Sequence, residues 1–282
     1  MMFDVASPSE IVSHQRAVGE LRVGVRRREQ ASVIADLRQV GCLKARFPRG
    51  DDTGWLDVAM LNLSGGVAGG DRLDVRIDVA PGAQVTVSAQ AAERFYRALP
   101  ASPPALLRSV INVADGGAAE WLPQESILFD RCHLDRRLDI NLASQARFLG
   151  LEMLIFGRAA MGEQVTTAHI SDVIHLRRDG RPILHDAIRL QGDVAKILAR
   201  PAVARGARSV ATLVMVGPEV ENMLTPLRDV VAEMPAEAGA SCWDGMLVLR
   251  ALAANGAALR ATVIAALRVL RPGRNVPRVW MC

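Results

Sequence analysis

Residues 73–88 read LDVRIDVAPGAQVTVS, and this stretch decides the fold. Apolar and charged residues alternate strictly from Leu73 to Val79, which is the pattern of a strand with one buried face. Pro81-Gly82 then marks a turn, and a second alternating segment follows at residues 84–88. The stretch therefore predicts two short strands joined by a tight connection.

The same kind of segment recurs along most of the chain. Further strands are predicted at residues 21–25, 31–39, 56–62, 106–113, 118–122, 136–143, 148–156, 165–176, 182–190 and 246–253. The run at 148–156 is apolar, so we expect it to be buried on both faces. Apolar residues recur at helical spacing in two places, 217–233 and 257–270, next to prolines. The sequence predicts a single, mostly β domain over residues 1–282, with many short strands, two helices near the C-terminus and a flexible stretch over about residues 1–18.

The composition argues against several classes of protein. The formal net charge is +4, and all but two of the 34 basic residues are arginine. These charges are spread along the chain and only eleven residues are aromatic. We therefore expect no nucleic-acid partner, although a basic nucleic-acid-binding module stays an alternative. No apolar run reaches the ~18 residues that a membrane helix needs, and residues 1–19 lack a signal-peptide core. We expect no membrane association and a cytoplasmic location.

Motifs for common catalytic and nucleotide sites are missing from the sequence. No glycine loop ends in Gly-Lys-Ser or Gly-Lys-Thr, so we expect no bound nucleotide. The H-E-x-x-H and G-x-S-x-G motifs are also missing. The run from Gly65 to Gly70 lacks dinucleotide-loop spacing and precedes a strand pattern, which favours a tight turn over a ligand cradle. The four cysteines are far apart in the chain, and we expect reduced thiols.

One pair of histidines bears on a possible metal site. The hairpin predicted around Asp179-Gly180 carries His175 on its first strand and His185 on its second. A two-residue turn would pair His175 with Leu184 and place the imidazoles on opposite faces, whereas a three-residue turn would place them opposite one another. Because Asp-Gly favours the two-residue turn, the prediction is against a shared metal.

Four motifs, in a fixed order, carry a resemblance to one family. They are residues 41–48 (GCLKARFP) with 62–71 (NLSGGVAGGD), residues 88–97 (SAQAAERFYR), residues 120–129 (EWLPQESILF) and residues 157–163 (GRAAMGE). The closing LRP at 270–272 and PRVW at 277–280 fit as well. Together they resemble the UreD (UreH) family of urease accessory proteins. Ala89 and Arg94 depart from the family's T-T-Q-A-A-x-K-x-Y-R, which has threonine and lysine at those positions.

The resemblance implies a fold, a role and partners. The implied fold is a β-rich helicoid of strands with a pair of helices. The implied role is that of a non-catalytic scaffold and metallochaperone subunit, which binds UreF directly, meets the GTPase UreG through UreF and docks on apo-urease. Nickel in transit through an internal tunnel is the implied cargo. We expect the C-terminal helices and the arginine-rich tail to face the partner, and a mean hydropathy of +0.17 fits apolar surface that a partner covers.

A conduit must hold nickel weakly, and single carboxylates release it more readily than thiolates or clustered imidazoles. Asp71, Glu125 and Glu163, which lie within or at the ends of three motifs, are the predicted residues of the nickel route. The structural alternative is that Asp71 shapes a turn and that each glutamate pairs with an arginine, with Arg158 the candidate for Glu163. The alternative function is a β-rich hydrolase with Glu125 and Glu163 as an acid/base pair, which requires both carboxylates in one open cleft.

Overall fold

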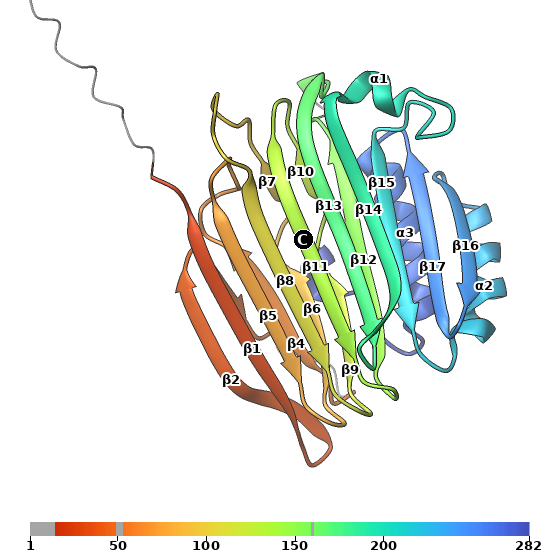
Figure 1. Ribbon diagram of the computed structural model, residues 1–282. Helices are drawn as coiled ribbons and strands as arrows, with labels where there is room; N and C mark the ends of the chain where they lie inside the picture. The colour runs from red at the N-terminus through yellow and green to blue at the C-terminus, as the bar shows by residue number, and fades with distance from the viewer. Residues whose placement is uncertain (1–14, 49–52, 159–160, 282) are drawn as a thin grey trace, which may run out of the picture.

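Two β-sheets stacked face to face form the body of the molecule (Figure 1). The computed structural model describes residues 15–48, 53–158 and 161–281, so the flexibility predicted for residues 1–18 falls mostly outside the described residues. Sheet A has seven strands in the order β14-β13-β11-β8-β5-β1-β2. Their bounds are β1 Val18–Arg28, β2 Ala31–Gly41, β5 Arg72–Val79, β8 Ala105–Val113, β11 His133–Leu142, β13 Thr167–Arg178 and β14 Arg181–Asp193.

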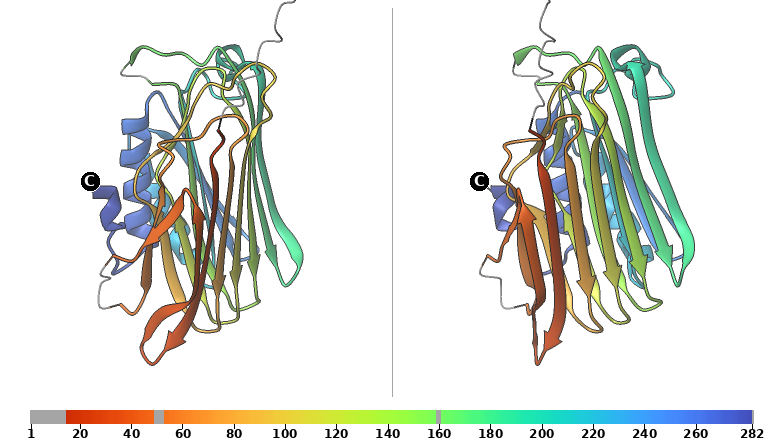
Figure 2. Two further views of the ribbon diagram at one scale, coloured as in Figure 1. Left: turned by 90° about the vertical axis from the view of Figure 1, so that its left-hand side faces the viewer. Right: turned by 60° about the vertical axis from the view of Figure 1, so that its left-hand side comes forward.

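Sheet B follows the order β16-β17-β15-β12-β9-β6-β4-β3, and the short strand β10 joins β7 to β12. The bounds are β3 Leu43–Arg46, β4 Leu56–Asn62, β6 Gln84–Ala89, β7 Glu93–Phe95, β9 Ala118–Leu122, β10 Ser126–Leu128, β12 Arg147–Phe156, β15 Ser209–Val216, β16 Glu237–Trp243 and β17 Met246–Ala253. The helices are α1 Val194–Leu198, α2 Val220–Ala232 and α3 Gly256–Leu270, and a 3-10 helix follows at Arg278–Met281. Figure 2 shows α2 and α3 on the side of sheet B that faces away from sheet A.

The chain winds between the two sheets, so that each strand pairs with the strand one turn later. In sheet A, β5 pairs with β8 and β8 pairs with β11; in sheet B, β6 pairs with β9 and β9 pairs with β12. All four pairings are parallel. The turn at Pro81-Gly82 carries the chain from sheet A to sheet B, rather than back along the same sheet. This winding is the helicoid arrangement that the resemblance implies.

Two hydrophobic cores result from this layering. The main core fills the space between the sheets, where side chains such as Ile77, Ile111 and Ile140 are at most 1% exposed. A second core lies between sheet B and the helices α2 and α3. Strand β12 contributes to both cores, with Leu154 in the first and Leu151 in the second. Its apolar run is therefore buried on both faces, as predicted.

The mostly β fold with two helices near the C-terminus is confirmed, and each predicted strand and helix is present with ends shifted by a few residues. The pattern misses β3, β7, β10, β15, β16 and α1. Three of these six elements have only three or four residues, and β16 consists largely of small residues (EAGASCW), so their local signals are weak. Within the described residues, no helix is long and apolar enough to cross a membrane.

The predicted register of the hairpin between β13 and β14 is wrong. Asp179-Gly180 forms the two-residue turn as predicted, but a β-bulge adds one extra residue, Ile183, to β14. The bulge shifts the register by one, so that His175 lies directly opposite His185 on the same face of sheet A. A turn motif determines only the residue pairs next to the turn. A bulge further along the strand changes the later pairs, and the sequence of the turn does not indicate it.

Candidate functional site

A cavity of about 260 Å³ lies between the two sheets. Much of its wall is apolar, with Leu73, Leu107 and Phe95 among the lining residues. Its polar lining residues include Asn62, Glu93, Arg94, Ser109, Gln124, Ser126, Arg136 and Glu152. Residues from the first three sequence motifs line it together, although these motifs are far apart in the chain. The winding of the strands thus brings the motifs to one internal space.

Arg136 is the centre of an ion cluster in the wall of this cavity. Its Nε and Nη2 atoms donate to the two carboxylate oxygens of Asp172 at 2.8 and 2.7 Å. Its Nη1 atom lies 2.8 Å from Glu152 Oε2 and donates to Ser126 Oγ at 2.8 Å. The side chains of Arg136, Glu152 and Asp172 are 11%, 7% and 7% exposed. When all three are ionised, one buried cation faces two buried anions, and the cluster has an excess of negative charge.

The surroundings of Glu152 disfavour the charged form of its carboxylate. Burial raises the pKa of Glu152, the Arg136 guanidinium opposes this shift, and the neighbouring Asp172 adds to it. The indole Nε1 of Trp121 donates to Glu152 Oε1 at 2.9 Å. The other oxygen, Oε2, accepts no well-aligned hydrogen bond from any described residue. This oxygen is held by the 2.8 Å ion pair with Arg136 Nη1, so a cation bound there would compete with the guanidinium.

The carboxylates continue beyond Glu152 into a small adjoining pocket. Asp172, Asp186 and Thr212 line this pocket together with Glu152. Thr212 Oγ1 donates to Asp186 Oδ2 at 3.2 Å, and Arg250 Nη2 donates to Asp186 Oδ1 at 2.8 Å. The Arg250 side chain is 56% exposed, so Asp186 lies close to the molecular surface.

Glu93 and the glycine turn form another part of the cavity wall. Asn62 Nδ2 donates to Glu93 Oε2 at 3.1 Å, and burial raises the pKa of Glu93. The backbone φ angles of Gly65 and Gly66 are +77° and +136°, which fits the predicted tight turn. Tyr96 covers this turn, and its hydroxyl donates to Gly65 O at 2.8 Å. We call Glu93, Glu152, Asp172 and Asp186 the interior carboxylate series.

Asp71, the first residue predicted for a nickel route, is buried and holds the backbone of a turn. Its Oδ1 atom accepts the N–H of Ala17 at 2.8 Å, and its Oδ2 atom accepts the N–H of Ala68 at 2.8 Å. These bonds fasten the segment before β1 to the glycine run. The contacts match the structural alternative, in which Asp71 shapes a turn.

Glu125 and Glu163 each pair with an arginine. Glu125 Oε2 lies 3.1 Å from Arg260 Nη1 in α3. Glu163 Oε2 accepts from Arg158 Nε at 2.7 Å, which is the partner that the sequence suggests. Burial alone would raise the pKa of Glu163, but the hydrogen bond from Arg158 lowers it below its ordinary value. The two glutamates share no contact partner in the described part of the chain, and each has the arginine partner that the structural alternative names.

None of the three predicted residues is among the described residues that line the main cavity. The carboxylates that do line the two pockets carry a different sequence signal. Glu152 interrupts the apolar run of β12, and Asp172 and Asp186 lie at positions where the alternation of their strands requires an inward, apolar residue. A charged residue on the inward phase of a strand is the signal that sequence reasoning missed.

The interior carboxylates are distributed and do not form a compact metal centre. Among the described residues, no group of three or more His, Cys, Asp or Glu side chains has the arrangement of a metal site. Arg136 also separates the charges of Glu152 and Asp172. Such a set can give a cation successive single oxygen ligands, which suits brief contact better than tight retention.

Comparison with known proteins gives one consistent result. Residues 17–281 match the family model described as UreD urease accessory protein. A protein named urease accessory protein UreD from Rhodopseudomonas palustris (strain HaA2) is 38% identical over 98% of this chain and 97% of its own length. Its namesake from Paracoccus denitrificans (strain Pd 1222) is 41% identical over 99% of this chain and 96% of its own length. One from Bradyrhizobium diazoefficiens is 38% identical over 100% of both chains.

Proposed function

The chain belongs to the UreD family of urease accessory proteins, and we propose that it is a non-catalytic scaffold that delivers nickel to apo-urease in the cytoplasm. In this proposal it binds UreF directly, meets UreG through UreF and docks on apo-urease. Support comes from similarity to named urease accessory proteins over essentially the whole chain.

The interior carboxylate series is the observation that carries the nickel part of the proposal. Buried carboxylates are costly to the fold unless they are paired, and this cluster has one arginine for two acids at its centre. A passing divalent cation would offset that imbalance. The cavity beside Glu152 provides the space for the ion and its remaining water ligands.

Arg136 gives this route a physical reason to release its cargo. The guanidinium already neutralises part of the charge on Glu152 and Asp172, so a nickel ion at Glu152 Oε2 competes with it. Competition lowers the net gain from binding and shortens the residence of the ion. Coordination by oxygen ligands alone, without a thiolate or an imidazole, also shortens the residence of the ion.

A comparison of two glutamate variants tests this route against the one predicted from sequence. Glu152→Gln removes the charge and keeps an oxygen that can accept the Trp121 hydrogen bond, whereas Glu163→Gln removes the charge of a sequence-predicted residue. Asp78→Asn on sheet A is the matched control, because Asp78 is 45% exposed and contacts Arg76 and Asn112. Each variant is co-expressed with a UreF-type partner, purified by size exclusion and assayed for nickel-dependent activation of apo-urease.

We expect Glu152→Gln to form the same complex as wild type and to activate urease several-fold less well, with Asp78→Asn unchanged. Loss of activation only in Glu163→Gln would favour the route through Asp71, Glu125 and Glu163 instead. A wild-type chain that neither binds the partner nor raises urease activity would contradict the scaffold role itself.

A further inference from the structure

The outer face of sheet A carries an arrangement of histidines that the interior route does not use. The four histidines of the described residues form two pairs of register partners, His133 with His169 and His175 with His185. The imidazole centroids of His175 and His185 are 4.4 Å apart, and the ring planes meet at 36°. This close pair exists because the bulge at Ile183 brings the two residues opposite one another.

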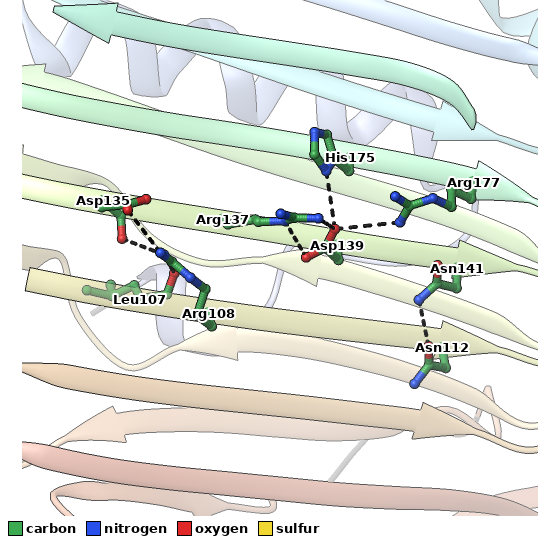
Figure 3. Close-up of polar contacts among 9 residues, drawn as sticks. All are labelled: Leu107, Arg108, Asn112, Asp135, Arg137, Asp139, Asn141, His175 and Arg177. Carbon is green, nitrogen blue, oxygen red and sulfur yellow. Dashed lines mark hydrogen bonds and ion pairs between the residues drawn. The ribbon is translucent and has the colours of Figure 1, made fainter. Parts of the chain in front are cut away.

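Asp139 on the neighbouring strand β11 orients the first imidazole of this close pair. His175 Nδ1 lies 3.3 Å from Asp139 Oδ1, and Figure 3 shows the imidazole directed at that carboxylate. Asp139 is fixed in turn by Arg137, whose Nε and Nη2 atoms donate to it at 2.7 and 2.9 Å. A carboxylate that accepts the Nδ1 proton leaves the Nε2 lone pair of His175 free to bind a metal.

The accessibility of the pair suits a small ligand from solvent. The His175 side chain is 19% exposed, and His185 is exposed. Both residues extend from the face of sheet A opposite the main core, because Ile174 and Leu176 on either side of His175 point inward. The two helices of the C-terminal region lie behind sheet B and leave this face uncovered (Figure 2).

We propose that His175 and His185 form a two-imidazole site for a borderline divalent cation such as Ni²⁺ or Zn²⁺ on the outer face of sheet A. Water ligands complete the coordination, and Asp139 acts as a positioning residue. The site stands apart from the interior carboxylate series and does not rest on the proposed function.

The charges around the pair define which cations it takes. Arg137 and Arg177 both contact Asp139, with Arg177 Nη1 3.7 Å from Oδ1, so the carboxylate is already neutralised. Attraction by negative charge alone is therefore weak here, and Mg²⁺ or Ca²⁺, which prefer oxygen ligands, gain nothing from two imidazoles. The affinity comes from the ring nitrogens, which suit nickel, copper and zinc.

The second histidine pair supplies a control on the same sheet. His133 and His169 are also register partners in β11 and β13, but their ring centroids are 5.3 Å apart. His133 Nδ1 lies 3.4 Å from the backbone oxygen of Ser102 rather than beside a carboxylate. This pair shares the residue type, the sheet and nearly the same spacing, and it lacks the orienting carboxylate.

The test is calorimetric titration of NiCl₂, ZnCl₂ and MgCl₂ into the full-length chain without an affinity tag, alone or in its complex. We expect His175→Ala and His185→Ala each to lose one equivalent of Ni²⁺ that wild type and His169→Ala bind. Asp139→Asn should bind that equivalent about 10-fold more weakly, as expected when the group that orients an imidazole is removed. Magnesium should give no corresponding heat.

Thermal unfolding with and without NiCl₂ gives a second readout. Nickel should raise the melting temperature of wild type and His169→Ala more than that of His185→Ala, because binding to the folded state stabilises it. Equal nickel stoichiometry in wild type and His185→Ala would overturn the proposal, as would equal binding of magnesium. Because His185 is exposed, its substitution leaves the fold intact and the comparison valid.

Discussion

Arg271, the residue that follows α3, forms a bidentate ion pair with Glu120 of β9. Arg271 Nε donates to Glu120 Oε1 at 3.0 Å, and Nη2 donates to Oε2 at 2.9 Å. Both side chains are buried, at 2% and 7% exposed. Arg274 Nη1 donates to the same carboxylate at 2.8 Å. The contact joins residues 151 positions apart and fastens the C-terminal segment to sheet B.

The first prediction is that Arg271→Ala lowers the free energy of unfolding by about 3 kcal/mol. Removing one member of a buried ion pair typically costs ~3–5 kcal/mol, and Arg274 still satisfies part of Glu120, which favours the lower figure. Urea unfolding measures the change. Arg268→Ala, an exposed arginine in the last turn of α3, is the control and should shift stability by no more than about 0.5 kcal/mol. Equal effects of the two substitutions would contradict the assigned role of Arg271.

A second prediction separates two adjacent glycines in the cavity wall. A Cβ at Gly66 would overlap the Tyr96 ring, whereas a Cβ at Gly65 meets nothing within 4 Å. Both residues have positive φ, but +77° at Gly65 is close to the left-handed region that alanine can adopt, whereas +136° at Gly66 lies outside it, so the backbone strain is also greater at Gly66. Gly66→Ala should cost about 2 kcal/mol more than Gly65→Ala, because it also displaces Tyr96. Denaturant titration of both variants checks this, and similar losses would show that the ring moves aside freely.

A third prediction concerns pH and Asp130, which precedes β11. Asp130 Oδ1 accepts from Thr166 N, Thr166 Oγ1 and Thr167 N at 2.8, 2.9 and 3.0 Å. Burial opposes the shift, but these bonds lower the pKa of Asp130 below its ordinary value of 3.8. The stability that it contributes is therefore complete above pH 3.8 and is lost as the pH falls through the lower folded-state pKa.

Asp130→Asn isolates that contribution, because the amide keeps an acceptor oxygen and cannot ionise. Wild type should be more stable than the variant at pH 7 and at pH 5, and the difference should shrink towards pH 3. Equilibrium unfolding in urea across this range provides the measurement. A difference that stays constant down to pH 3 would mean that the ionised form of Asp130 adds nothing to the fold.

The fourth prediction is that Cys132 resists alkylation in the folded protein. The residue is 1% exposed, and burial raises the pKa of its thiol to about 12. Because the thiolate is the reactive form, iodoacetamide at pH 8 should label Cys132 at least roughly 100-fold more slowly than the partly exposed Cys242. Peptide mass mapping follows each site, and labelling in urea, where both sites should react alike, is the control. Matching rates in the folded state would place Cys132 in a region that opens readily.

Local alternation located the strands, and it could not reveal how they pair. The segment from Leu73 to Val79 identifies a strand by itself, because the period of two is a property of consecutive residues. Its partner is β8, where Leu107 lies beside Leu73, and nothing near either residue specifies that pairing. The family resemblance, not the alternation, supplied the helicoid winding. The predicted register of the two histidines was wrong for a similar reason, since the bulge at Ile183 depends on contacts across the sheet.

The interior carboxylate series consists mostly of residues that the motifs did not single out, although segments of three motifs line the same cavity. The motifs did mark segments that line the cavity, because glycine turns and short loops bring those segments inward. Asp71, Glu125 and Glu163 were selected because they lie within or at the ends of motifs, where turns and arginine partners also occur. Glu152 and Asp172 lie inside strands, and they are distinguished only because they occupy positions where the alternation places apolar, inward-pointing residues. The pair of Arg158 and Glu163 was predictable because the two residues are close in sequence.

The alternation of β11, β13 and β14 has a consequence for how this chain can change in evolution. Each strand presents charged or polar groups on both faces: Arg136, Asp172 and Asp186 inward, and Asp139, His175 and His185 outward. In these three strands the even-numbered residues of this set point into the molecule and the odd-numbered ones point outward. Deleting one residue between Arg136 and Asp139 in β11 would place these two side chains on the same face, whereas deleting two would keep them on opposite faces. The length of these strands is therefore constrained in steps of two, and the two faces can be altered separately only by substitution.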